Sequence, residues 1–147
     1  MKPRLYVLGV VVVLLGLVSS AWAEKKPSGT KGGGRFTTTE SGLKYKDLVI
    51  GKGRKAVEGD TATIHYIGWL KNGARFDNSR DQNKPVSFRM GTGQVIRGWE
   101  EGLKGMQVGG KRKLILPPDL GYGARGQGIF IPPNATLMYE IELVDLR

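Results

Sequence analysis

A short apolar stripe in the second half of the chain most constrains how it can fold. Ile96, Trp99 and Leu103 recur at helical spacing and share one face, while Glu100 and Lys104 stand four residues apart as a pair on another face. The spacing predicts one short amphipathic helix. Such a helix is too short to be stable alone in water, so its Trp99 face must pack against the strand-like segments around it.

The segments on either side of this helix alternate as β-strands do. Between residues 61 and 70, apolar residues at every second position place Tyr66 on the core face and His65 on the opposite face. Asn72-Gly73 then predicts a hairpin turn, because both residues tolerate positive φ. Further strands are predicted at residues 43–50, 85–90, 111–116 and 135–146. About five strands and one helix, with connections that suit antiparallel pairing, indicate an α+β domain.

The beginning of the chain has the pattern of an export signal. Lys2 and Arg4 precede an apolar run over residues 5–18, and the small residues Ala21 and Ala23 follow it. This pattern predicts a secretory signal peptide that is cleaved after Ala23. An uncleaved membrane anchor is the alternative, although the apolar run is shorter than the roughly 20 residues that a spanning helix needs.

The 147-residue chain is therefore predicted to have three parts: a signal peptide (1–23), a flexible basic linker (24–40) and one folded domain (41–147). The linker holds several Gly and Lys residues and almost no large apolar ones, so it cannot bury enough surface to order itself. Loss of the signal leaves 124 residues, enough for one core but not comfortably for two.

The composition removes most catalytic chemistries. There is no cysteine, although an exported chain could form disulfides, and His65 is the only histidine. Thiol catalysis and cysteine or multi-histidine metal sites lack their ligands, so we expect no metal and no cofactor. The 23 basic residues, less Lys2 and Arg4, exceed the 13 acidic ones by eight. This charge leaves a nucleic-acid or membrane-surface binder as an alternative, but export argues against nucleic acid.

Several short motifs are spread along the second part of the chain, and both their residues and their order are informative. They are Gly59-Asp60, His65-Tyr66, Asn72-Gly73, Phe76-Asp77, Asn83-Lys84-Pro85, the run from Val95 to Glu100, Tyr122-Gly123, and Ile131-Pro132-Pro133 followed by Ala135-Thr136-Leu137. In this order they resemble the FK506-binding-protein (FKBP) type of peptidyl-prolyl cis-trans isomerase, across roughly residues 41–147. The resemblance implies a five-to-six-stranded antiparallel half-barrel sheet wrapped around one short helix.

The resemblance also implies a pocket in which a substrate proline ring sits on the indole of Trp99. Carried over position by position, the catalytic residues are Phe76, Asp77, Trp99 and Tyr122. The substrate-binding residues are Tyr66, Phe88, Val95, Ile96, Ile131 and Tyr139. The chain departs from the best-known members at Gln82, Val86, Phe130 and Tyr139, which affects the shape of the pocket but removes no essential group.

Such a pocket can catalyse isomerisation without a nucleophile. Rotation about an X-Pro bond crosses a barrier of about 20 kcal/mol because it breaks amide resonance. The twisted amide is less polar than the planar one, so an apolar, water-poor cavity favours the transition state. A non-catalytic chaperone module that holds proline-containing segments in the same pocket is the alternative, and activity on a proline peptide separates the two.

The partners follow from the resemblance. It implies proline-containing polypeptides as substrates and FK506- or rapamycin-type macrolides as ligands. We expect a monomer that binds no nucleic acid and assists the folding of exported proteins. No retention tetrapeptide closes the chain at residues 144–147, which favours a bacterial periplasm. A eukaryotic secretory or organelle lumen, or a membrane-anchored state, is the alternative.

Overall fold

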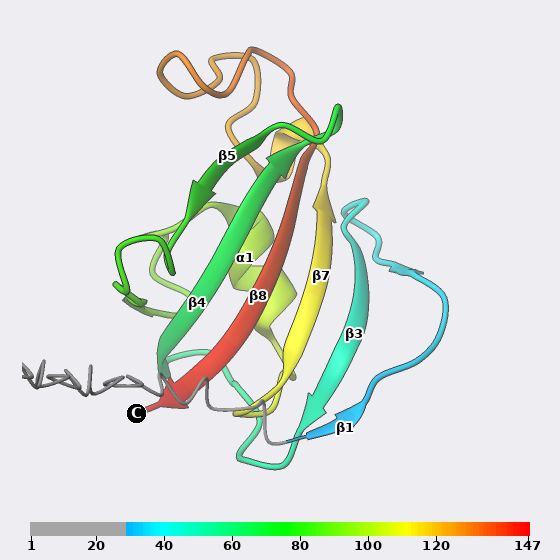
Figure 1. Cartoon of the computed structure of the whole chain (residues 1–147), viewed down its shortest axis with the longest axis vertical. Coiled ribbons are helices and arrows are strands. Elements are labelled where there is room, and N and C mark those ends of the chain that lie inside the picture. The colour runs from blue at the N-terminus through cyan, green and yellow to red at the C-terminus, as the bar shows by residue number, and fades with distance from the viewer. Residues whose placement is uncertain (1–28) are drawn as a thin grey trace, which may run out of the picture.

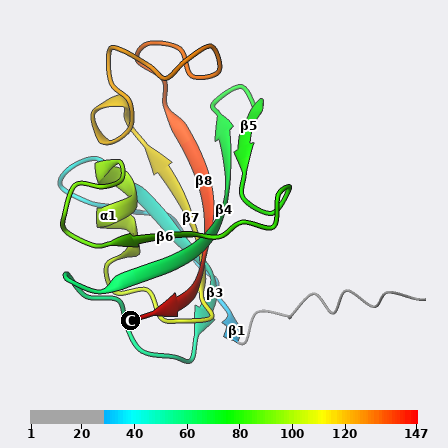
Figure 2. The same ribbon diagram turned by 90° about the vertical axis from the view of Figure 1, so that its left-hand side faces the viewer.

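The computed structural model describes residues 29–147, so the predicted signal peptide lies outside the described residues. In the described part, one antiparallel sheet of eight strands curls around a single α-helix (Figures 1 and 2). The strands are β1 (Gly29–Lys31), β2 (Thr37–Thr38), β3 (Lys44–Gly51), β4 (Thr61–Leu70), β5 (Arg75–Asn78), β6 (Val86–Arg89), β7 (Lys111–Leu116) and β8 (Leu137–Leu146). The helix is α1 (Arg97–Leu103), and a 3-10 turn, η1 (Pro118–Leu120), follows β7.

Two long strands form the centre of the sheet. β4 and β8 lie side by side and pair from Ala62 opposite Leu146 to Leu70 opposite Leu137, with one register shift between Thr63 and Ile64 (Figure 1). The strand order is β1-β3-β7-β8-β4-β5, with β2 also on β3 and β6 also on β4. The helix covers one face of this sheet, and no helix of residues 29–147 lies against the other face (Figure 2). The predicted α+β half-barrel is therefore confirmed.

The helix is seated closely on β7 because it presents glycine to the strand. A Cβ on Gly98 would lie 2.1 Å from Leu116 Cδ2, and one on Gly102 would lie 2.5 Å from Leu114 Cδ1. This approach buries the face of α1 that carries Trp99, which is 8% exposed. The predicted packing of the Trp99 face against strands is thus confirmed.

The predicted ion pair on the other face of α1 is wrong. Glu100 accepts a hydrogen bond from the Gly93 N–H at 3.0 Å instead. Lys104 is the C-cap residue, with φ −55° and ψ 127°, so its side chain leaves the helical path on which an i, i+4 contact depends.

The predicted linker differs from the structure where the structure describes it. β1 pairs with β3 from Gly29 opposite Gly51, and β2 pairs with it through Thr37 and Thr38. The outer edge of β3 offers unpaired N–H and C=O groups, and pairing with them needs no apolar side chain. Composition could not indicate this, because the contact is made by backbone.

A second contact ties the end of the same segment to the helix. Thr39 Oγ1 donates to Glu101 Oε1 at 2.6 Å, and Ser41 Oγ donates to both Glu101 oxygens at 2.8 and 2.7 Å. Residues 29–32 and 37–41 are therefore bonded to the domain. Over residues 29–147, no helix has the length and apolar character to cross a bilayer.

Candidate active site

An aromatic cavity of about 180 Å³ opens between the inner face of the sheet, α1 and the long loop after η1. Its floor and walls come from four elements: α1, β4, β5 and β8. The loop supplies the remaining side. The lining residues are Tyr66, Phe76, Asp77, Trp99, Tyr122, Gln127, Phe130, Ile131 and Tyr139.

Edge-to-face contacts hold the aromatic rings of the floor. The Trp99 and Tyr139 centroids lie 5.2 Å apart at 83°, and those of Phe76 and Tyr139 lie 5.7 Å apart at 90°. Tyr66 packs on Trp99 at 4.7 Å. The indole N–H of Trp99 is buried without a hydrogen-bond partner among residues 29–147, so packing alone orients this ring. These arrangements are the ones that aromatic quadrupoles favour, and they give the floor a defined shape.

One carboxylate enters the cavity, and it is already engaged. The Tyr66 hydroxyl donates to Asp77 Oδ2 at 2.5 Å, and Asp77 Oδ1 accepts the Asn78 N–H at 2.8 Å. Burial, and then the hydrogen bond to Asp77, raise the pKa of Tyr66 above its ordinary value. The hydroxyl therefore stays protonated at neutral pH and keeps Asp77 in place as an acceptor.

The hydroxyl of Tyr122, which also lines the cavity, is not engaged in the same way. The Tyr122 side chain makes no hydrogen bond to any residue of the described range. Burial, and then the nearby Asp77 carboxylate, raise the pKa of Tyr122. Tyr122 is therefore a protonated donor that faces the cavity without an internal acceptor.

The loop over the cavity has a defined shape, an arch that closes between Gln127 and Ile131. The backbones of Gln127 and Ile131 exchange two hydrogen bonds, at 2.8 and 3.1 Å. At the tip between them, Ile129 is 92% exposed and Phe130 is 65% exposed, whereas Ile131 is 4% exposed. In Figure 1 this arch projects beyond the end of the sheet. It brings Gln127, Phe130 and Ile131 to the mouth of the cavity.

Seven of the ten predicted site residues line the cavity, and three do not. Phe88 is 4% exposed and lies behind Trp99, with the ring centroids 6.3 Å apart. Val95 and Ile96 are half-buried at the start of α1, where the Ile96 carbonyl accepts the Trp99 N–H at 3.0 Å. These three residues support the floor from behind or at its edge.

Gln127 lines the cavity although the sequence did not indicate it. It stands in a Gly-rich segment with no periodicity, and only the Gln127–Ile131 bridge brings it to the mouth. Over the described residues no cluster of acidic, histidine or cysteine side chains could hold a metal ion. The cavity thus offers aromatic surface, one fixed acceptor, and the hydroxyls of Tyr122 and Tyr139, which make no hydrogen bond within the described residues.

Comparison with known proteins agrees with this geometry. Residues 52–144 match the family model described as FKBP-type peptidyl-prolyl cis-trans isomerase. An FK506-binding protein of Neisseria meningitidis serogroup B is 53% identical over 103 residues, which cover 70% of this chain and 94% of that protein. FK506-binding protein 2 of Dictyostelium discoideum is 42% identical over 149 residues, which cover 100% of both chains.

Solved structures of the same kind superpose on the fold. The crystal structure of AtFKBP13 gives a TM-score of 0.72 at 40% identity, over 78% of this chain and 100% of that one. The crystal structure of FkpA from Escherichia coli gives a TM-score of 0.71 at 44% identity, over 76% of this chain and 51% of that one. The chain therefore belongs to the FKBP-type peptidyl-prolyl cis-trans isomerase family.

Proposed function

We propose that this protein accelerates cis-trans isomerisation of X-Pro bonds during the folding of exported proteins. The observation that carries the proposal is the aromatic cavity itself, in which Tyr66 holds the carboxylate of Asp77 and the Tyr122 hydroxyl has no partner among residues 29–147. This set of groups suits binding and polarity matching rather than covalent chemistry.

The floor supplies the differential binding that catalysis needs. A proline ring seated on Trp99 places the preceding amide against Phe76 and Tyr139, whose rings line the cavity. The planar amide is stabilised by its resonance dipole and its hydration, and the twisted amide loses the dipole. An apolar aromatic wall therefore favours the twisted state over the planar one.

The polar groups have separate roles in the proposal. Tyr122 donates a hydrogen bond to a substrate carbonyl next to the proline. The Ile96 backbone N–H, which makes no hydrogen bond within the described residues, donates a second at the edge of the floor. Asp77 holds the Tyr66 hydroxyl through a hydrogen bond and presents a negative potential to the carbonyl that reorients.

The decisive experiment is catalysis of isomerisation in a short X-Pro peptide by the purified protein, with and without excess FK506. Acceleration that the macrolide abolishes is the expected result, because both ligands occupy the same aromatic floor. A folded protein that gives no acceleration contradicts the proposal.

A non-catalytic module that holds proline-containing segments is the second candidate. The exposed apolar tip of the arch favours it, because Ile129 and Phe130 offer surface that a single proline does not cover. In that case the protein binds an unfolded proline-containing chain, yet leaves the isomerisation rate of the tetrapeptide unchanged. The two candidates therefore separate on one pair of measurements.

We also propose where in the cell the protein acts. The N-terminal export pattern and the bacterial relative from Neisseria support a periplasmic location. The match to the Dictyostelium protein over both whole chains keeps a secretory or organelle lumen as the alternative. Fractionation of cells that produce the full chain, with sequencing of the mature N-terminus, tests location and cleavage after Ala23 together.

A further inference from the structure

One edge of β4 has no strand partner at the point where it carries Tyr66. β6 pairs with β4 from Thr61 to Ile64, and β5 pairs with it from Ile67 onward. Tyr66 lies between these two stretches. Its N–H and C=O on this edge need another partner, because buried backbone polar groups are costly when unpaired.

Ser79 is that partner. Its Oγ accepts the Tyr66 N–H at 2.9 Å, and its backbone N–H donates to the Tyr66 carbonyl oxygen at 3.0 Å. Ser79 is 7% exposed, and its own carbonyl accepts the Lys84 N–H at 3.0 Å. A single residue after the end of β5 thus continues the pairing of the two strands.

The contact between Ser79 and Tyr66 continues the register in which β4 pairs with β5 beside the cavity. Gly68 lies opposite Asp77 and Ile67 opposite Asn78, so Tyr66 opposite Ser79 is the next pair in the same alignment. The Tyr66 hydroxyl reaches Asp77 Oδ2 from this position. Ser79 therefore restrains both backbones whose side chains meet in the Asp77–Tyr66 hydrogen bond.

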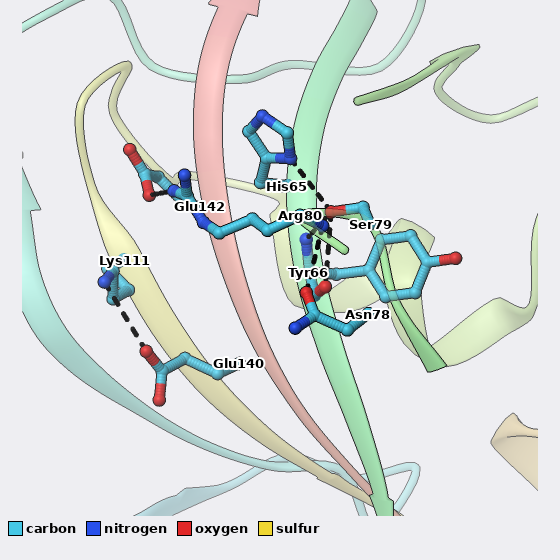
Figure 3. A network of polar contacts seen from close by, with 8 residues as sticks. All are labelled: His65, Tyr66, Asn78, Ser79, Arg80, Lys111, Glu140 and Glu142. Atoms are coloured by element: carbon cyan, nitrogen blue, oxygen red, sulfur yellow. Dashed lines mark hydrogen bonds and ion pairs between the residues drawn. The ribbon is translucent and has the colours of Figure 1, made fainter. Parts of the chain in front are cut away.

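His65 holds the serine hydroxyl from the outer side of the sheet. Figure 3 shows Ser79 between the His65 ring and the Tyr66 backbone, and His65 Nδ1 lies 2.9 Å from Ser79 Oγ. Ser79 Oγ also lies 3.3 Å from the Tyr66 carbonyl oxygen. A serine hydroxyl has one hydrogen, so it donates either to a neutral imidazole or to that carbonyl.

Burial and the charge of Arg80 favour the neutral form of the His65 ring. Arg80 pairs with Glu142 beside it, and Lys111 pairs with Glu140 on the neighbouring strands (Figure 3). Burial, and then the Arg80 charge, lower the pKa of His65, while Glu142 opposes them. At neutral pH the ring can accept the Ser79 hydroxyl hydrogen and orient Oγ toward the Tyr66 N–H.

We propose that Ser79, oriented by His65, is a positioning residue that holds Asp77 against the Tyr66 hydroxyl and so sets one wall of the cavity. Its kinetic consequence rests on the proposed isomerase function. Its geometric consequence rests only on the Asp77–Tyr66 hydrogen bond.

The test compares Ser79→Ala with Ser87→Ala. Ser87 is a matched control because its Oγ lies 2.7 Å from Thr63 Oγ1, joining β6 to the same edge of β4 away from the cavity. The first readout is the proton NMR signal of the Tyr66 hydroxyl, assigned by its absence in Tyr66→Phe. In Ser79→Ala we expect this proton to shift upfield and exchange faster with solvent. In Ser87→Ala and in Ser79→Thr, which keeps the hydroxyl, we expect it to stay near its original position.

The second readout is kinetic. We expect Ser79→Ala to lower kcat by about tenfold or less, the factor that one hydrogen bond is worth, with a smaller change in KM. Ser79→Thr should recover most of the rate. If Ser79→Ala does not fold, Ser79→Cys, which is a weak acceptor of similar size, replaces it and should show a partial shift of the hydroxyl signal.

An unchanged Tyr66 hydroxyl signal in a folded variant without the serine oxygen overturns the proposal. An equal change in Ser87→Ala also overturns it, because the effect is then general loosening of β4. A wild-type protein without isomerase activity refutes the proposed function alone, since the hydroxyl signal still decides whether Ser79 positions the pair.

Discussion

The floor of the cavity and the arch at its mouth are built by different means. On the floor, Trp99 and Tyr139 are 8% and 2% exposed, and each ring packs edge-on against another ring. In the arch, two backbone hydrogen bonds between Gln127 and Ile131 define the shape, and the tip leaves Phe130 65% exposed. A change on the floor therefore disturbs the core, whereas a change at the tip alters what the mouth contacts and leaves the core intact.

The largest effect is expected on the floor. Phe76→Ala should lower kcat/KM by about a hundredfold, because loss of the ring admits water and shifts the bound amide. Asp77→Ala should also slow turnover, through the loss of the acceptor for Tyr66. The measurement is isomerisation of an X-Pro peptide. Phe36→Ala removes a 40% exposed phenylalanine outside the cavity and should leave the rate unchanged. Normal rates in both floor variants would refute the assignment of the site.

The second-largest effect is expected where α1 packs on β7, under the floor of the cavity. Gly98→Ala should destabilise the protein by about 1–3 kcal/mol through overpacking, since the added Cβ would lie 2.1 Å from Leu116 Cδ2. Urea denaturation measures the change in the free energy of unfolding. The sign is informative, because alanine for glycine inside a helix otherwise stabilises by about 1 kcal/mol. A more stable variant would show that α1 can move away from β7 without cost.

A smaller effect is expected in the arch. Phe130→Ala should raise KM about threefold, because it removes part of one apolar contact, while kcat and the melting temperature stay the same. The matched control is Ile129→Ala, which changes the neighbouring side chain, 92% exposed and outside the cavity lining. A fall in the melting temperature of Phe130→Ala would remove the distinction between floor and arch.

The smallest effect concerns the outer side of β4. The lowered pKa of His65 means that the unfolded chain binds a proton more readily than the folded one. The neutral His65 ring therefore contributes to the stability of the fold above about pH 6.5, the ordinary pKa of histidine. This contribution is lost as pH falls through the lower pKa that His65 has in the folded protein. Urea denaturation between pH 8 and pH 5 should show the decrease, and His65→Gln should show less of it. Equal pH dependence in both proteins would mean that other groups cause it.

Periodic patterns were sufficient to predict the strands and the helix. The strand at residues 111–116 was predicted with the bounds that β7 has, and the stripe of Ile96, Trp99 and Leu103 led to α1. Such patterns work because one face of each element is buried against the others. The position of β1 and β2 could not be predicted in this way, since backbone pairing with the edge of β3 requires no apolar period.

The site was predictable only in part. Seven of the ten predicted residues line the cavity, and the family resemblance had placed them there through its motifs. Phe88 instead lies behind Trp99, and sequence spacing does not separate the ring that forms a wall from the ring that supports it. Gln127 reaches the mouth only because the arch closes on itself.

The amino-acid sequence by itself determined the class of this protein: an α+β domain of the FKBP family with an aromatic pocket and no thiol chemistry. Local periodicity indicates the strands and the helix because it depends on neighbouring residues, and the resemblance of the ordered motifs to the FKBP family implies the pocket. The tertiary structure alone decided that residues 29–32 and 37–41 are bonded to the domain and that Ser79 bonds to Tyr66 across the end of β5. These contacts join backbone and small polar groups far apart in the chain, and hydrogen bonds of that kind leave no periodic pattern in a sequence.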